Sequence, residues 1–166
     1  FGLVASKADH HIRNFNKEKS DKFLLILEEE YKDKADDVSK VNYYYSNKAA
    51  YLENSGDIQE AIKIRLKIRE FYSLIRDNTL NSPFRFSTIA LGNAYLKAKE
   101  YEKALVEFDI AREIIYDNNI SYYDFFNVPL FTNIAECYIK LNKPYRAIPL
   151  LRDSLFIVEN NSKGTD

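Results

Sequence analysis

The chain has 166 residues, of which 46% are hydrophobic and 30% are charged, so intrinsic disorder is excluded for most of it. This length suits one domain or one continuous array of small units. The 24 basic residues are balanced by 25 acidic residues, which argues against binding to nucleic acid or to an acidic membrane surface. Only four Gly and four Pro are present, too few for a turn-rich β-sandwich or barrel, so an all-α fold is expected.

No apolar stretch is long enough for a transmembrane helix, and the first residues lack the pattern of a signal peptide. We therefore expect a cytoplasmic protein that does not bind membranes. The sequence contains no Met, not even at its first position, so we also expect it to be a segment or processed product of a longer chain.

Apolar residues recur at intervals of three and four, the spacing of amphipathic helices. The N-terminal part, about residues 1–35, keeps such a stripe at Phe23, Leu24, Leu27 and Tyr31, although it matches the later part of the chain only weakly. Three pairs of helices are expected beyond it. Their first members span about 42–54, 84–98 and 128–141, and their second members carry stripes over 61–75, 104–115 and 147–158. The last stripe consists of Ala147, Ile148, Leu151, Leu155 and Val158.

The breaks between these helices have physical causes. In Ser55-Gly56-Asp57 the glycine can end a helix in a left-handed conformation, and Asp57 with Glu60 resembles a capping box. Helix starts are expected at Ser82-Pro83, Asn127-Val128-Pro129 and Asn142-Lys143-Pro144. Because the breaks are short, consecutive helices should pack antiparallel.

The chain also repeats itself at an interval of 43 residues, which separates Ala61 from Ala104 and Ala104 from Ala147. The same interval relates Ala49, Gly92 and Ala135; Leu52, Tyr95 and Tyr138; Ile62, Leu105 and Ile148; Phe71, Ile114 and Ile157; and Tyr72, Ile115 and Val158. Small residues stay small and large apolar residues stay large. This register is typical of helical-hairpin repeats, whose units bury their faces by stacking on one another.

The middle unit reads Leu91-Gly92-x-x-Tyr95, then Ala104, Phe108 and Ala111, and is similar to the tetratricopeptide repeat. The third unit reads Asn133-Ile134-Ala135-x-x-Tyr138, and its long period resembles the extended repeats of kinesin light chains and bacterial regulators. In that class a proline such as Pro149 occurs within the second helix, which implies a bend there. The usual Trp is replaced by Tyr45, Thr88 and Phe131, and the first unit departs most, with Lys48, Arg65 and Ile68 where Leu, Phe and Ala are usual.

The resemblance implies a right-handed α-α superhelix of about four hairpins. It predicts a single repeat domain over 1–160, with units at about 1–35, 42–78, 84–118 and 127–160, and a flexible tail at 161–166.

No residue pattern indicates catalysis, a metal site or a cofactor, so the chain is not expected to be an enzyme. His10 and His11 would point about 100° apart on a helix, which does not suit one metal ion. Cys137 is interpreted as packed core and Glu28-Glu29-Glu30 as a solvated face. The aromatic residues at 43–45, 122–123 and 125–126 suggest base stacking, but no cationic groove accompanies them, so helix packing is the preferred interpretation.

The resemblance further implies that the first helix of each unit lines a concave groove. The residues left on that side are Tyr43, Ser46, Asn47, Ala50, Glu53 and Asn54; Phe86, Ile89, Ala90, Asn93, Leu96 and Lys97; and Pro129, Thr132, Asn133, Glu136, Ile139 and Lys140. This mixture of amides, hydroxyls, charges and apolar groups suits a peptide or protein segment, although an ordinary solvated face is the alternative. The stripe lacks the Lys, Asn and Arg set of a carboxylate clamp.

The leading hypothesis is a protein-interaction scaffold that binds a peptide or protein segment in this groove. One alternative is the sensory or regulatory part of a larger bacterial regulator. Another is a self-associating structural module, suggested by Phe156, which lies away from the expected stripe of the last helix and would contact a second copy or a further repeat.

Overall fold

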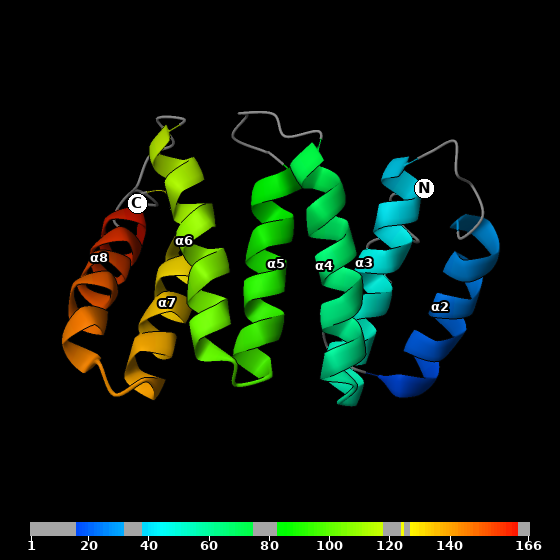
Figure 1. Ribbon diagram of the computed structural model, residues 1–166, viewed down its shortest axis with the longest axis horizontal. Helices are drawn as coiled ribbons and strands as arrows, with labels where there is room; N and C mark the ends of the chain where they lie inside the picture. Colours follow the sequence, from blue (N-terminus) through cyan, green and yellow to red (C-terminus); the bar gives the residue numbers. More distant parts are fainter. Residues whose placement is uncertain (1–15, 32–37, 75–82, 118–123, 125–126, 163–166) are drawn as a thin grey trace. The chain divides into compact units, whose positions relative to one another are not determined.

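The structure is a computed structural model that describes residues 16–31, 38–74, 83–117, 124 and 127–162. All regular secondary structure among these residues is helical. The helices of this described part, in chain order (Figure 1), are α2 (Lys17–Tyr31), α3 (Val38–Ser55), α4 (Ile58–Leu74), α5 (Pro83–Lys97), α6 (Tyr101–Asp117), α7 (Val128–Lys140) and α8 (Pro144–Ser162). The predicted all-α class is therefore confirmed. The chain divides into two compact units, Phe1–Phe71 and Tyr72–Asp166, which are considered separately below.

Each helix expected beyond residue 40 is present, with small shifts at its ends. The expected tail at 161–166 begins too early, because α8 continues through Ser162 and the Asn161 side-chain amide donates to the Ile157 carbonyl oxygen at 2.8 Å. A single domain over 1–160 stays a prediction. Several sequence predictions lie outside the described residues, namely those on His10, His11, Ser82, Tyr122, Tyr123, Phe125 and Phe126.

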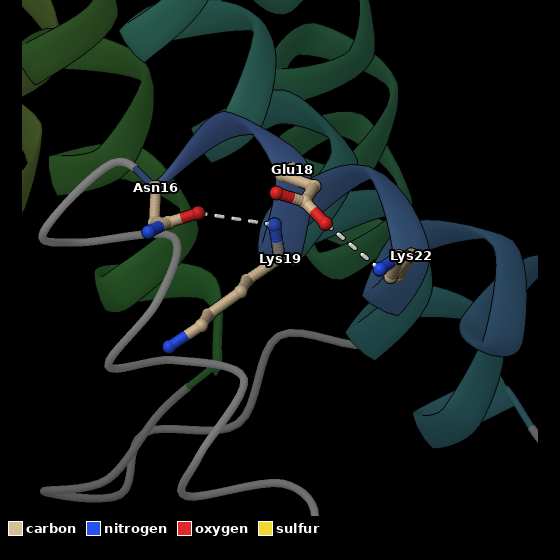
Figure 2. Close-up of polar contacts among 4 residues, drawn as sticks. All are labelled: Asn16, Glu18, Lys19 and Lys22. Atoms are coloured by element: carbon tan, nitrogen blue, oxygen red, sulfur yellow. Dashed lines mark hydrogen bonds and ion pairs between the residues drawn. The ribbon is translucent and has the colours of Figure 1, made fainter.

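In the first unit, α2 begins at a side-chain cap. The Oδ1 atom of Asn16 accepts a hydrogen bond of 3.1 Å from the backbone N–H of Lys19, which would otherwise lack a partner inside the helix (Figure 2). One turn further, Glu18 and Lys22 form an exposed ion pair at 2.9 Å. The helix expected from Phe23, Leu24, Leu27 and Tyr31 is therefore present as α2.

The core of the first unit is aromatic. Phe23 and Leu27 of α2 are buried with Tyr44 of α3, and Tyr43 and Tyr45 pack around them. Tyr44 and Tyr45 meet edge to face, with ring centroids 5.0 Å apart. Helix packing is thus confirmed as the role of Tyr44, the central residue of the tyrosine run.

An ion pair joins α3 to α4. Arg65 Nε lies 2.9 Å from Glu53 Oε1, and the two side chains are only 12% and 7% exposed. Arg65 occupies the register position that holds Phe108 in α6. Arg65, which departs from the repeat pattern, therefore makes a charged contact where Phe108 makes an apolar one, and Glu53 of the preceding helix neutralises its charge.

In the second unit the small residues of the repeat lie between the helices. Ala104, Ala135 and Ala147 are buried, and so is Gly92. A Cβ atom placed on Gly92 would come within 2.5 Å of the Phe108 ring, so this position admits no side chain. The α5–α6 hairpin therefore closes tightly because one residue has no side chain.

The three hairpin turns share one backbone geometry at the 43-residue interval. Gly56, Lys99 and Asn142 adopt φ values of 101°, 61° and 58°. The next N–H of each turn bonds back to the carbonyl oxygen five residues earlier: Asp57 to Leu52 at 2.9 Å, Glu100 to Tyr95 at 2.9 Å, and Lys143 to Tyr138 at 2.8 Å. This is the left-handed C-terminal turn of a helix. The left-handed conformation expected at Gly56 is confirmed, and the repeat extends to backbone geometry.

The buried face of α8 differs from the expected stripe. Ala147, Leu150, Ser154 and Ile157 are buried, and Ser154 donates to the Leu150 carbonyl oxygen at 2.9 Å. The other residues of the expected stripe are exposed: Ile148, Leu151, Leu155 and Val158. The expected stripe is thus wrong for every member except Ala147, because an apolar pattern alone does not show which of two neighbouring faces has a helix packed on it.

The turn geometry predicts the effects of substitution at the left-handed positions. Lys99→Gly should stabilise the second unit by about 0.5–1 kcal/mol, because a residue with a Cβ atom is strained at positive φ and Gly is not. Asn142→Gly should gain less, since Asn tolerates this conformation. Gly56→Ala should cost about 1 kcal/mol. Urea unfolding followed by circular dichroism measures all three, and a loss of stability in Lys99→Gly would contradict the assignment.

The Glu53–Arg65 pair predicts a double-mutant cycle. Arg65→Leu alone should destabilise the first unit by about 2 kcal/mol, because it leaves the Glu53 carboxylate buried without its counter-charge. Adding Glu53→Leu should restore most of that loss, since an apolar pair of similar volume packs without a desolvation penalty. The free energies of unfolding of the single and double variants decide this. Additive losses would show that the two side chains are not coupled.

Candidate functional site

The structure brings two predicted site residues together in the second unit. Helices α5 and α7 are in contact, and because α6 turns the chain back between them they run in the same direction. The Nδ2 atom of Asn133 on α7 donates to Oδ1 of Asn93 on α5 at 2.8 Å. Both side chains are partly buried. We call the surface around this bond the α5/α7 face; its residues are Phe86, Ile89, Ala90, Asn93, Leu96 and Lys97 with Pro129, Thr132, Asn133, Glu136, Ile139 and Lys140.

The Asn93–Asn133 bond uses one of the four hydrogen-bonding positions of each amide. Asn93 keeps its NH2 group as a donor, and Asn133 keeps its carbonyl oxygen as an acceptor. A peptide backbone presents one acceptor and one donor at each residue, so the pair is chemically complementary to it. The bond also holds each amide in one orientation, which lowers the entropy that binding would cost.

Apolar surface lies to either side of this polar centre. Phe86, in the first turn of α5, is half exposed, and the guanidinium carbon of Arg85 lies 4.8 Å from its ring centroid. Ile139, near the end of α7, is also half exposed, whereas Ile89 and Leu96 pack partly against the core. The face thus offers hydrophobic area at its two ends.

The remaining polar residues of the face differ in their availability. The Thr132 hydroxyl lies 3.0 Å from the carbonyl oxygens of both Val128 and Pro129, so its proton is directed to its own helix. Glu136, Lys97 and Lys140 are exposed. The two lysines occupy equivalent positions in the last turns of α5 and α7, where a cation also complements the helix dipole.

The residues predicted on α3 belong to the other unit, and two of them are used internally. Asn47 is 8% exposed, and its side-chain amide donates to the Tyr43 carbonyl oxygen at 2.8 Å. Glu53 is held in the ion pair with Arg65. These two assignments to an exposed binding stripe are corrected, because helix-internal and interhelical contacts occupy the polar groups. Ser46 is partly buried and Asn54 is exposed, while Tyr43 and Ala50 pack on the aromatic core.

Sequence reasoning missed Arg85, which is buried at the start of α5. Burial lowers the pKa of its guanidinium, and the nearby Asp124 carboxylate acts in the opposite direction. The register offered no signal for it, because Asn42 and Val128 stand at the equivalent positions. Arg85 anchors the ring of Phe86 and so shapes one end of the α5/α7 face.

Other chemistry finds no support among the described residues. Within them, no group of three or more His, Cys, Asp or Glu is arranged to hold a metal ion. None of the described helices combines the length and apolarity needed to cross a bilayer. Cys137 is fully buried, as predicted, and burial raises the pKa of its thiol to about 11. The thiolate that would act as a nucleophile is therefore scarce at neutral pH.

The state of Cys137 predicts its reactivity. At pH 8 the native chain should react with a disulfide reagent such as DTNB at least about 100-fold more slowly than the unfolded chain, because the thiol is both protonated and covered. The released chromophore in buffer and in guanidinium chloride measures this. Since the native pKa is raised, the thiol also stabilises the fold below about pH 9 and loses that contribution as the pH rises toward 11. Fast native labelling would contradict the buried position.

No family model matches the chain, and comparisons with the curated proteins and with the solved structures yield no match.

Proposed function

We propose that the second unit is a protein-interaction module that binds an extended peptide segment along the α5/α7 face. The observation that carries the proposal is the Asn133–Asn93 bond at 2.8 Å, which pre-orients one amide donor and one amide acceptor on neighbouring helices. The common turn at 56, 99 and 142 supports a second part of the proposal: the hairpins are tetratricopeptide-like repeats that form a right-handed superhelix with α3, α5 and α7 on its concave side.

The spacing along α5 sets the length of the ligand. Phe86 and Asn93 are two helical turns apart, about 10 Å, and Lys97 lies about 6 Å further on. An extended chain advances about 3.3 Å per residue, so the recognised segment spans about five residues. Its apolar side chain would cover Phe86, its backbone would bond to the two Asn side chains, and an acidic residue would face Lys97 and Lys140.

The charges of the face favour an acidic ligand residue at the end that carries Lys97 and Lys140. Two exposed lysines lie at one end of the face, and Glu136 lies one turn before Lys140 on α7. The ligand contact at this end would be partly screened by salt, since the lysines are solvated. Membership in a larger bacterial regulator stays a prediction, because no described residue bears on it.

The proposal predicts a separation of binding from stability. Dodecapeptides selected by phage display against the full 166-residue chain should share an apolar residue followed by an acidic one. Asn93→Ala with Asn133→Ala should weaken their binding at least about tenfold, because each lost hydrogen bond is worth about 1 kcal/mol. Fluorescence anisotropy measures the affinity. The fold should lose only about 1 kcal/mol, the contribution of the bond between the two amides.

Asn160→Ala is the matched control, since Asn160 is an exposed amide on α8, outside the face. It should leave affinity and stability unchanged. Lys97→Glu with Lys140→Glu should abolish selection of acidic peptides. Selected peptides that bind the double alanine variant as tightly as the native chain would refute the assignment of the face.

A further inference from the structure

The last helix carries an apolar face on which none of the described helices packs. Ile148, Leu151, Leu155 and Val158 are spaced three, four and three residues apart, and each is between 41% and 58% exposed. This spacing places them along one side of α8, next to its buried side. We call these four residues the α8 stripe. Four aligned aliphatic side chains on one surface form a larger apolar patch than scattered exposed residues do.

The preceding hairpin shows what covers such a stripe. The interval of 43 residues relates the α8 stripe to Leu105, Phe108, Arg112 and Ile115 of α6. Phe108 and Ile115 are fully buried, and Leu105 packs partly against the same core cluster. That cluster includes Leu130, Ile134 and Cys137 of α7, the helix that follows α6 and contacts it. The equivalent surface of α6 is therefore mostly buried, between α5, where the Phe108 ring lies against Gly92, and α7; Arg112 is the exception, partly exposed and paired with Asp109 at 2.8 Å.

The equivalence between α6 and α8 rests on backbone geometry as well as on sequence. Both helices follow a left-handed turn, at Lys99 and Asn142, closed by the same bond across five residues. Both bury an alanine at their second turn, Ala104 and Ala147. The α8 stripe thus repeats a surface that is already covered once inside the second unit. Figure 1 shows α8 beside α7 at the end of this unit.

We propose that the α8 stripe binds an amphipathic α-helix of a partner protein, antiparallel to α8, as α7 lies on α6. The chemistry of that helix follows from α7 and from the charge beside the stripe. It carries apolar residues at three-four spacing, as the buried side of α7 does with Leu130, Ile134 and Cys137. Arg152 is exposed beside the stripe, so we expect the partner helix to carry an acidic residue opposite it. This surface is separate from the α5/α7 face.

Charge favours a partner over a second copy of the chain. An antiparallel pair of α8 helices would match Ile148 with Val158 and Leu151 with Leu155. The symmetry axis would then pass beside Arg152, and the two Arg152 side chains would meet on the same rim and repel each other.

A helical probe tests the proposal on the full chain. The probe is a fluorescein-labelled peptide with the sequence of residues 127–143, with Cys137→Ala and with a side-chain lactam between positions 136 and 140 to hold it helical. The lactam lies on the exposed side of α7, so the apolar side is unchanged. It uses the carboxyl group of Glu136, the one acidic residue of the probe, so the probe tests the apolar contact with the α8 stripe and not the contact with Arg152. The probe should bind the native chain in an anisotropy titration, and Leu151→Glu with Leu155→Glu should weaken binding at least tenfold.

Two control variants distinguish binding at the α8 stripe from binding elsewhere on the chain. Phe156→Glu changes an equally exposed apolar residue on another side of α8 and should leave binding within twofold. Asn93→Ala with Asn133→Ala should also leave it unchanged, which distinguishes this site from the α5/α7 face. Because the stripe is exposed, its variant should keep the native helical spectrum and melting temperature. An equal loss in the Phe156 variant, absence of binding to the native chain, or a sedimenting dimer that the stripe variant abolishes would each overturn the proposal.

Discussion

The second unit depends on how closely the two helices of a hairpin approach each other. At Gly92 the Phe108 ring occupies the space that a side chain would need, and its nearest atom would lie 2.5 Å from an added Cβ. The buried Ala104 lies on the facing helix of the same hairpin. Because the helices meet at small residues, the large apolar side chains interdigitate around them and form one continuous core. The position of α7, and with it the α5/α7 face, follows from that closure.

The same backbone turn is built from three different residues. Gly56 adopts positive φ without strain, Asn142 tolerates it, and Lys99 is held there by the bonds on either side of it. The hairpin geometry is therefore imposed by packing and by the bond between the Glu100 N–H and the Tyr95 carbonyl oxygen. Local preference alone would not place a lysine in this conformation.

Equivalent positions of the repeat have different environments in different hairpins. The position of Phe108 holds Arg65 in α4, where Glu53 neutralises it, and Leu151 in α8, where it is exposed. An apolar residue at this position is a core residue only where another helix covers it. The two candidate surfaces follow from this rule: the α5/α7 face is the side of the first helices that carries the Asn93–Asn133 pair, and the α8 stripe is the second-helix surface that has no cover among the described residues.

The sequence by itself determined the helical class, the helices beyond residue 40 to within a few residues, the small buried positions and the turn at Gly56, because these depend on spacing and on local backbone preference. It also predicted that Asn93 and Asn133 belong to one stripe shared by the first helices. Only the tertiary structure decided that these two amides bond, that Asn47 and Glu53 are used internally, and that Ile148 and Val158 are exposed while Leu105 and Ile115 are covered. Except for the Asn47 bond, which lies within α3, each of these depends on which helix lies opposite, and such a contact joins residues whose relation no local pattern encodes.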